Sequence, residues 1–194
     1  ANRLGGTFLY LPLSYTPQVI RRNLQTLCTA LDVTYDPAED EARAQQALRH
    51  AKALLGDTEI AIDYTATPAP MSLARCLIEH GLRVSRIYAD SIAAGDLDDF
   101  RWLQEHAPDL SLYETVEYKL RVLPRRTERP MLAIGQKAAY FTGTRHFVNI
   151  VEGGGMYGFD GICRLCARIE EAFLTARDPR NYIQQKGLGC ESCL

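Results

Sequence analysis

The sequence lacks the features of membrane, fibrous and disordered proteins. It contains no apolar run long enough to cross a bilayer, no internal repeat and no low-complexity segment. No apolar stretch of the signal-peptide kind stands at its start, so we expect no signal peptide. Lysine and arginine number 22 against 24 aspartates and glutamates, a net charge of -2. With no cationic excess, neither nucleic acid nor an anionic membrane is an expected partner.

Common catalytic and cofactor motifs are also missing. The chain has no GxGxxG fingerprint at its first strand–helix turn, no GK[ST] ending of a P-loop and no GxSxG elbow. These absences argue against a nicotinamide site at that turn, a P-loop nucleotide site and a serine hydrolase. The histidines show no metal-ligand spacing and are expected at the surface or at helix ends; they are His50, His80, His106 and His146.

What remains is the composition of a globular protein. Of the 194 residues, 46% are hydrophobic and 24% charged, which suits one domain, or one domain with an attached segment. The 6 cysteines are too few for a disulfide scaffold, and Cys28 and Cys76 lie in helical patterns where a thiol is usually a small buried hydrophobe. We therefore expect a cytoplasmic protein with reduced thiols.

Strand and helix patterns alternate along most of the chain. Thr7–Leu11 indicates a strand, and two helices are expected at 16–31 and 36–54. From residue 57 the alternation is regular. Strands are predicted at 59–64, 83–88, 110–113, 131–134 and 146–151, and helices at 71–80, 96–105, 115–123, shortly after 137, and up to about 176. This alternation predicts an α/β fold, a Rossmann-like doubly wound parallel sheet with an N-terminal helical lead-in.

The pattern divides the chain into three predicted parts. Residues 1–56 form a strand and two-helix lead-in from a preceding domain, 57–177 form the Rossmann-like domain, and 178–194 form a C-terminal tail. Ligands of such sheets gather at the carboxyl ends of the strands. The functional edge is therefore expected at three loops, which are 65–70, 135–137 and 152–158.

A glycine-rich segment precedes the last predicted helix. Its glycines allow a backbone to approach a ligand closely, and a helix N-terminus offers free N–H groups to an anion; a flexible turn into the helix is an equally good interpretation. Lys137 follows Gly135 at a strand end and can face an anionic ligand, the alternative being a solvated lysine at a helix start. The predicted binding residues are Thr65, Thr67, Gly135, Lys137, Gly153, Gly154, Gly155 and Tyr157.

Two CxxC pairs stand near the end of the chain. Cys163 and Cys166 are separated by 23 residues from Cys190 and Cys193, so together they form a possible four-thiolate metal site. The gap is longer than in usual zinc ribbons, and Cys166 belongs to an apolar helical stripe, so core packing is its simpler interpretation. A redox CxxC at the tail is a further alternative.

The order of these segments resembles the nitrogenase component 1 family. Gly135-Gln136-Lys137 after a strand, and Gly-Met-Tyr-Gly-Phe-Asp-Gly at Gly155–Gly161 before an Ala/Leu-rich helix, are similar to the C-terminal Rossmann-like domain of its α-subunit-like members. Leu4–Phe8, with Pro12 and Thr16-Pro17, resembles the segment after the family's central domain. Because such chains are more than twice as long, the resemblance implies a C-terminal part of a longer protein.

The resemblance also implies an oxidoreductase subunit whose C-terminal part is inactive alone. In the family, an ATP-dependent iron–sulfur reductase passes electrons to clusters in component 1, which reduce dinitrogen, a tetrapyrrole or a cofactor precursor. An iron–sulfur cluster or related metallocofactor is thus expected in the intact protein, with none held by this part. The implied partners are the missing N-terminal domains, a homologous component 1 subunit and the reductase.

The match departs from the family at two places. Tyr157 stands where the nitrogenase α-subunit has a histidine ligand of its cofactor, and Ala69-Pro70-Met71 replaces an arginine-rich turn, whereas Lys137 matches the family's Gly-x-Lys. A phenol is a poor substitute for imidazole. The departures imply an unknown substrate or metallocofactor precursor rather than dinitrogen. Two other classes stay open, which are a non-catalytic cofactor-assembly or partner-docking domain and a four-cysteine metal or thiol protein.

Overall fold

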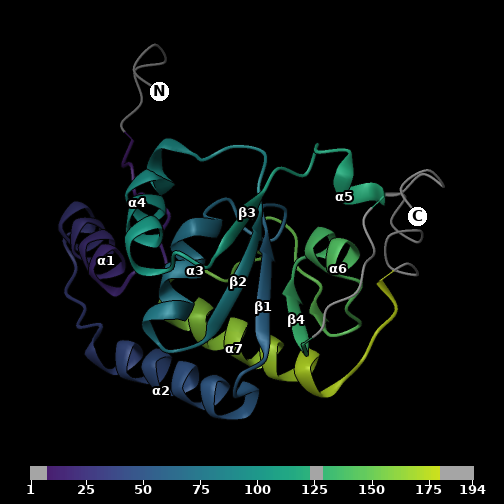
Figure 1. The fold of residues 1–194 in the computed structure, drawn as a ribbon. Coiled ribbons are helices and arrows are strands. Elements are labelled where there is room, and N and C mark those ends of the chain that lie inside the picture. The colour runs from purple at the N-terminus through teal and green to yellow at the C-terminus, as the bar shows by residue number, and fades with distance from the viewer. Residues whose placement is uncertain (1–7, 123–128, 180–194) are drawn as a thin grey trace.

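Five parallel strands form the centre of the fold in a computed structural model that describes residues 8–122 and 129–179 (Figure 1). Their order across the sheet is β3-β2-β1-β4-β5, and each neighbouring pair is parallel. This confirms the predicted Rossmann-like α/β class. The strands are β1 (Glu59–Asp63), β2 (Arg83–Tyr88), β3 (Ser111–Tyr113), β4 (Met131–Ile134) and β5 (Phe147–Val148).

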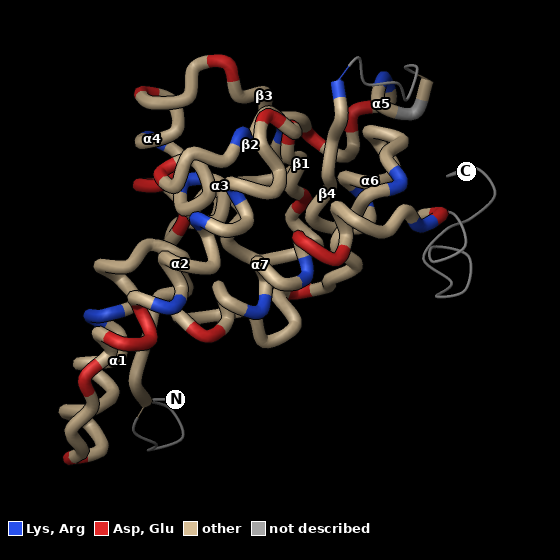
Figure 2. Tube along the Cα trace, turned by 90° about the horizontal axis from the view of Figure 1, so that it is seen from below, with Lys and Arg blue, Asp and Glu red and all other residues tan. Residues whose placement is uncertain are grey.

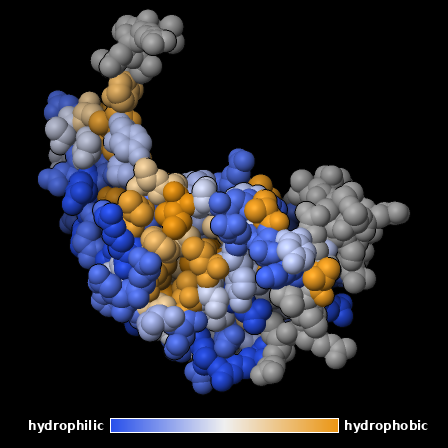
Figure 3. Space-filling model, turned by 45° about the horizontal axis from the view of Figure 1, so that its top comes forward, coloured by the Kyte–Doolittle hydropathy of each residue, from blue (hydrophilic) through white to orange (hydrophobic). Residues whose placement is uncertain are grey.

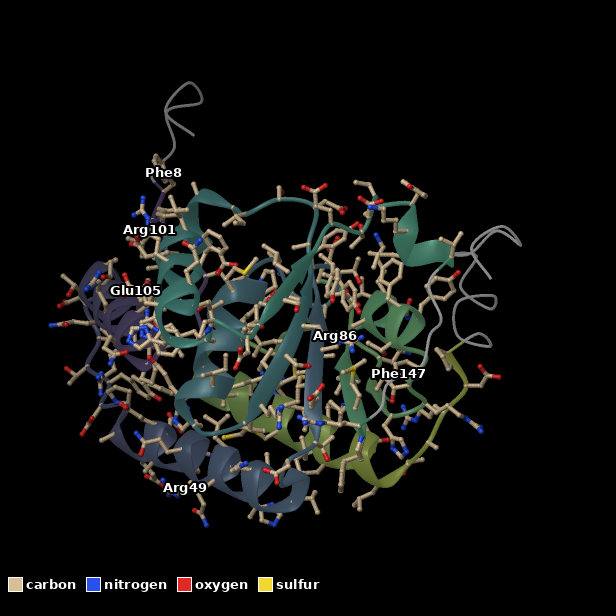
Figure 4. All side chains as sticks on the ribbon, viewed as in Figure 1. Phe8, Arg49, Arg86, Arg101, Glu105 and Phe147 are labelled. Atoms are coloured by element: carbon tan, nitrogen blue, oxygen red, sulfur yellow. The ribbon has the colours of Figure 1, made fainter. Side chains whose placement is uncertain are left out.

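Helices cover both faces of the sheet because the strands are apolar on both sides. In β1, Ile60 and Ile62 belong to the large core with α2, α3, α4 and α7, whereas Ala61 belongs to a smaller core with α5 and α6. Phe147 of β5 lies in that smaller core, and Arg86 of β2 lies toward the same side (Figure 4). The helices are α1 (Pro17–Leu31), α2 (Ala38–Leu55), α3 (Pro70–Glu79), η2 (Ala94–Asp96), α4 (Leu97–His106), α5 (Lys119–Val122), α6 (Gln136–Thr142) and α7 (Gly158–Leu174).

The two N-terminal helices differ in how they pack. Helix α2 lies along α7 and buries Ala44, Leu48, Ala51 and Leu55 in the large core. Helix α1 buries only Ile20 and lies at the edge of the molecule (Figure 2). The same view shows lysine and arginine interspersed with aspartate and glutamate over α2 and α7. Helix α2 therefore shares the core of the sheet, and the predicted boundary at residue 56 stays a prediction.

No helix among the described residues has the length and apolar character needed to cross a membrane.

Three predicted elements are absent or shorter than expected. The strand expected at Thr7–Leu11 is not formed in its described part, 8–11, because residues 14–16 dock on α3 and the segment before them pairs with no strand. The helix expected at 115–123 begins only at Lys119, since Asp90 holds the N–H of Thr115. The strand expected at 146–151 ends at Val148. Its partner strand β4 ends at Ile134, where the chain turns into α6, so residues after Val148 have no strand to pair with.

Candidate functional site

The direction of the strand order reverses between β1 and β4. The chain leaves β1 for α3, on the face of the large core, and leaves β4 for α6, on the opposite face. The two loops therefore diverge at the carboxyl ends of the two strands, which lie toward the top of Figure 1. Open α/β sheets bind ligands at this topological switch point, so the candidate site is built there.

Asp63, the last residue of β1, joins the loop that follows β1 to the start of α6. Its Oδ1 accepts hydrogen bonds from the N–H groups of Thr65 (2.8 Å) and Ala66 (3.1 Å) and from the Thr65 hydroxyl, and its Oδ2 accepts from the N–H of Ala138 (2.7 Å). Burial raises the pKa of Asp63, although these hydrogen bonds act to lower it. Gly135 has φ 110°, and a Cβ there would overlap the carboxylate. Asp63 is thus a structural brace that requires glycine opposite it.

Beside this brace, polar side chains lie at the ends of three neighbouring strands. The Lys137 ammonium donates to the Tyr64 hydroxyl and lies 4.3 Å from the centroid of its ring. Asp90 accepts hydrogen bonds from the N–H of Thr115 (2.9 Å) and from its hydroxyl, and Tyr64 lies near enough to help lower its pKa. Burial acts to raise the pKa of Asp90, but these hydrogen bonds and the Lys137 charge outweigh it and lower the pKa.

The glycine-rich loop 152–158 joins the loop that follows β1. The N–H of Glu152 donates to the carbonyl oxygen of Thr65 (2.7 Å), and the N–H of Gly153 donates to that of Ala66 (2.6 Å). Two loops about 85 residues apart in the sequence therefore meet at the carboxyl edge, since parallel strands end on the same side of their sheet. The segment 63–66 touches both this loop and the start of α6.

Tyr157 fills the inside of its own loop. Its hydroxyl donates to the carbonyl oxygen of Glu152 (2.7 Å), and a Cβ on Gly153, which has φ 77°, would overlap the phenol. The Tyr157 ring lies 6.3 Å from that of Tyr15, whose hydroxyl donates to Thr67 Oγ1 (3.0 Å). Burial raises the pKa of Tyr157. Its oxygen is therefore engaged by the backbone.

The structure arranges the predicted binding residues in two groups that meet at 63–66. Gly135 and Lys137 contact Asp63 and Tyr64 on the α6 side. The other group, on the α7 side, comprises Thr65, Thr67, Gly153, Gly154, Gly155 and Tyr157. Their role in ligand binding stays a prediction.

The N-terminus of α3 is occupied by a side chain of the protein itself. Asp96 accepts hydrogen bonds from the N–H groups of Met71 (2.8 Å) and Ser72 (2.9 Å) and is 3% exposed. Desolvation raises the pKa of Asp96 to about 6. Dinucleotide-binding domains place a pyrophosphate at the corresponding helix start. Here Asp96 takes that position, in keeping with the missing fingerprint. Sequence analysis did not single out Asp63, Tyr64, Asp90 or Asp96.

The described residues alone supply no cluster of metal-ligating side chains. No group of three or more His, Cys, Asp or Glu side chains among residues 8–122 and 129–179 is placed to hold a metal ion. Cys166 is buried, and burial raises its pKa to about 12; burial also raises the pKa of the half-buried Cys163. Cys190 and Cys193 lie outside the described residues. The phenol oxygen of Tyr157 donates its hydrogen to the carbonyl oxygen of Glu152.

Hydrophobic side chains gather on the face that the strand carboxyl ends form (Figure 3). Four large apolar residues of the loops and helix starts at this edge are exposed, namely Leu97, Val116, Tyr118 and Val151. The carboxyl edge of the sheet therefore exposes apolar as well as polar side chains.

The strand order and the flanking helices define a Rossmann-like domain, with its candidate site at the switch point. No protein-family model matches the chain, and no curated protein matches it. Among solved structures, nitrogenase Cp1 at pH 6.5 is similar, with a TM-score of 0.60 and 15% sequence identity over 95% of this chain. The chain spans 42% of that nitrogenase chain. A likeness at this identity shows a shared fold.

Proposed function

We propose that the chain is the C-terminal Rossmann-like domain of an oxidoreductase subunit of the nitrogenase component 1 kind. The observation that carries the proposal is the meeting of Lys137 and loop 152–158 at the carboxyl end of β1. Both belong to the motifs that resemble the family. The superposition of nearly the whole chain on part of a nitrogenase chain supports the same assignment.

In this proposal the domain binds and orients a substrate while electrons arrive from elsewhere. An ATP-dependent iron–sulfur reductase would supply them, and a homologous component 1 subunit and the N-terminal domains would complete the protein. The substrate is an unknown compound or a metallocofactor precursor. Dinitrogen is not proposed, because Tyr157 replaces the family's histidine and is bonded to Glu152. Because no group of three or more metal-ligating side chains gathers among the described residues, the proposal places any cluster outside them.

The proposal is tested by the metal content of the chain and by electron transfer to the intact protein. Iron, zinc and acid-labile sulfide are measured in this chain after purification and reconstitution without oxygen, and in the longer protein that contains it. We expect near-zero metal in the chain, and iron with sulfide in the longer protein, whose iron the reductase and MgATP reduce. A longer protein without iron, or without reductase-dependent redox change, would overturn the proposal.

The same measurement addresses the four-cysteine alternative. If this chain binds metal, the doubly substituted Cys190→Ser and Cys193→Ser protein should lose it, whereas Cys28→Ser, outside both CxxC pairs, should keep it. That pattern would assign the metal to the CxxC pairs and replace the oxidoreductase proposal.

A second candidate function is a non-catalytic docking or assembly domain. Helix α1 and the segment after it leave Leu31, Val33 and Tyr35 exposed. Val33 and Tyr35 line a cavity of about 510 Å³ together with Leu24 and Cys28. Exposed apolar area of this kind is typical of a protein-binding surface. Replacing Leu31 and Val33 by Ser should abolish association with a component 1 partner in sedimentation experiments without changing the circular dichroism of the chain.

A further inference from the structure

One face of the sheet is only partly covered by the described helices. Helices α2, α3, α4 and α7 pack on the face of the large core, whereas the described helices on the opposite face are α5, with 4 residues, and α6, with 7. Helix α6 packs on β1, β4 and β5 and reaches β2 at its carboxyl end, where Phe141 contacts Tyr88. Figure 1 shows β2 and β3 without a described helix in front of them. Because both faces of a parallel sheet are normally covered, this area is a candidate docking surface.

The register of β2 brings two arginines to this area. Arg83 pairs with Glu59 of β1. Arg86 pairs with Ala61, since the register between the two strands shifts by one residue before this pair. Ala61 belongs to the smaller core, so the residues in register with it and with Glu59 point to the face that carries α6. Arg83 and Arg86 therefore lie on the same face of the sheet.

A third arginine comes from the segment before β4. Arg129 is the last of 4 arginines between residues 121 and 129, and its Nη1 lies 3.4 Å from Oε1 of Glu59. The Nη2 of Arg83 lies 3.4 Å from the same oxygen. The side chains of Arg129 and Arg83 are 60% and 48% exposed, whereas that of Glu59 is 13% exposed. Two exposed guanidinium groups thus share one oxygen of a largely buried carboxylate.

The charges on this area do not balance. Among the strand residues that point to it, Glu59 is the one carboxylate in the amino-terminal half of the described sheet, and it stands against three guanidinium groups. A guanidinium has five N–H donors, so donors remain on each. Each of the three segments outside the described residues contains more lysine and arginine than aspartate and glutamate, so none of them supplies a net negative charge. We call this area the arginine face, and its residues are Glu59, Arg83, Arg86 and Arg129.

We propose that the arginine face docks an acidic segment of a partner protein. Charge complementarity selects this occupant, because carboxylates of the partner pair with guanidinium groups that Glu59 alone does not neutralise. The arginines stand on both sides of β1, with backbones about 10 Å apart, so a segment with several carboxylates fits them better than one small anion. The inference goes beyond the proposed oxidoreductase role and does not depend on it.

The test measures the binding of an acidic peptide to the chain. Fluorescence anisotropy follows a labelled hexaglutamate peptide at low ionic strength, with hexaglutamine as the uncharged control. We expect hexaglutamate to bind saturably and more weakly as salt is added, and hexaglutamine not to bind. Arg83→Gln together with Arg129→Gln should weaken binding by roughly five- to tenfold, the effect of losing two exposed ion pairs. Arg49→Gln with Arg101→Gln, on α2 and α4 (Figure 4), removes the same charge and should leave binding nearly unchanged.

A substitution with the opposite expected effect separates lost binding from lost folding. Glu59→Gln removes the carboxylate that Arg83 and Arg129 share, so hexaglutamate should bind about two- to fivefold more tightly. Glu105→Gln, on α4 (Figure 4), changes the net charge equally and should have little effect. Circular dichroism checks that each variant is folded.

Several results would overturn the inference. They are the absence of hexaglutamate binding at low salt, equal affinity for the two peptides, and equal effects of the two double substitutions. Self-association of the chain that Arg83→Gln and Arg129→Gln abolish in sedimentation experiments would assign the arginine face to a second copy instead. Because the titration needs neither metal nor reductase, its failure is distinguishable from failure of the oxidoreductase proposal.

Discussion

Removal of the Asp63 brace should destabilise the domain more than any surface substitution. The carboxylate accepts hydrogen bonds from three backbone N–H groups, at 2.7 to 3.1 Å, and from one hydroxyl. Asp63→Ala leaves those three N–H groups without their acceptor. An unsatisfied buried donor costs about 1–3 kcal/mol, and some reach water after the loop relaxes, so we expect a total loss of about 3–5 kcal/mol. Many domains are stable by only about 5–15 kcal/mol.

Asp63→Asn separates the geometry of the brace from its charge. The amide oxygen can replace Oδ1 toward Thr65 and Ala66, but the NH₂ group then faces the N–H of Ala138, which loses its acceptor. The expected loss is about 1–3 kcal/mol, smaller than for alanine. Burial raises the pKa of Asp63, so the folded state binds the proton more tightly than the unfolded state. The unsubstituted protein should therefore gain stability relative to Asp63→Asn as the pH falls toward the unfolded pKa, about 3.9.

The assay is equilibrium urea unfolding followed by circular dichroism. Asp57→Ala is the matched control, because Asp57 precedes the same strand and is exposed; its effect should stay within about 0.5 kcal/mol. Equal free energies of unfolding for Asp63→Ala and Asp57→Ala would refute the reasoning. A larger loss for asparagine than for alanine would refute the assignment of the acceptor bonds.

Gly153→Ala should destabilise the chain by about 1–3 kcal/mol, because φ is 77° and its Cβ would overlap the phenol of Tyr157; in thermal unfolding, Tyr157→Ala should recover part of that loss and leave the backbone strain. The stability of the protein relative to Asp96→Asn should rise by up to about 3 kcal/mol as pH falls from above 6 to below 4, since burial raises the folded pKa from 3.8 to about 6. A urea series across this pH range that shows the opposite slope would contradict the burial argument. Leu48→Ala, which empties the α2–α7 contact, should cost about 2–5 kcal/mol, whereas Arg49→Ala on the outer side of α2 (Figure 4) should be nearly neutral in the same assay.

The candidate site could be predicted from the sequence only as a set of loops. The positions of Lys137 and loop 152–158 after strands placed both at one edge, since all strands of a parallel sheet end on the same side. Which partner each residue meets depends on strand order. Tyr64 and Asp90 come from β1 and β2, and neither stands in a motif. One signal was present, a lone aspartate that ends the apolar strand 59–63.

The structure also shows hydrogen bonds that sequence patterns do not predict. The phenol of Tyr157, a predicted binding residue, lies within its own loop and donates to the carbonyl oxygen of Glu152. The helix after β3 is shorter than predicted because the N–H of Thr115 donates a hydrogen bond to Asp90, which follows β2. Propensity and periodicity are properties of neighbouring residues, and neither includes a hydrogen bond to a residue 25 positions away.

The amino-acid sequence by itself determined the α/β class, the parallel sheet and the edge where a ligand site belongs. These follow from apolar periodicity and from the alternation of strands with helices, which are local properties summed along the chain. Only the tertiary structure decided the brace at Asp63, the occupied start of α3 and the contact of Lys137 with Tyr64. Each of these needs two or more segments distant in the sequence to be placed within hydrogen-bond distance, and strand order sets that proximity.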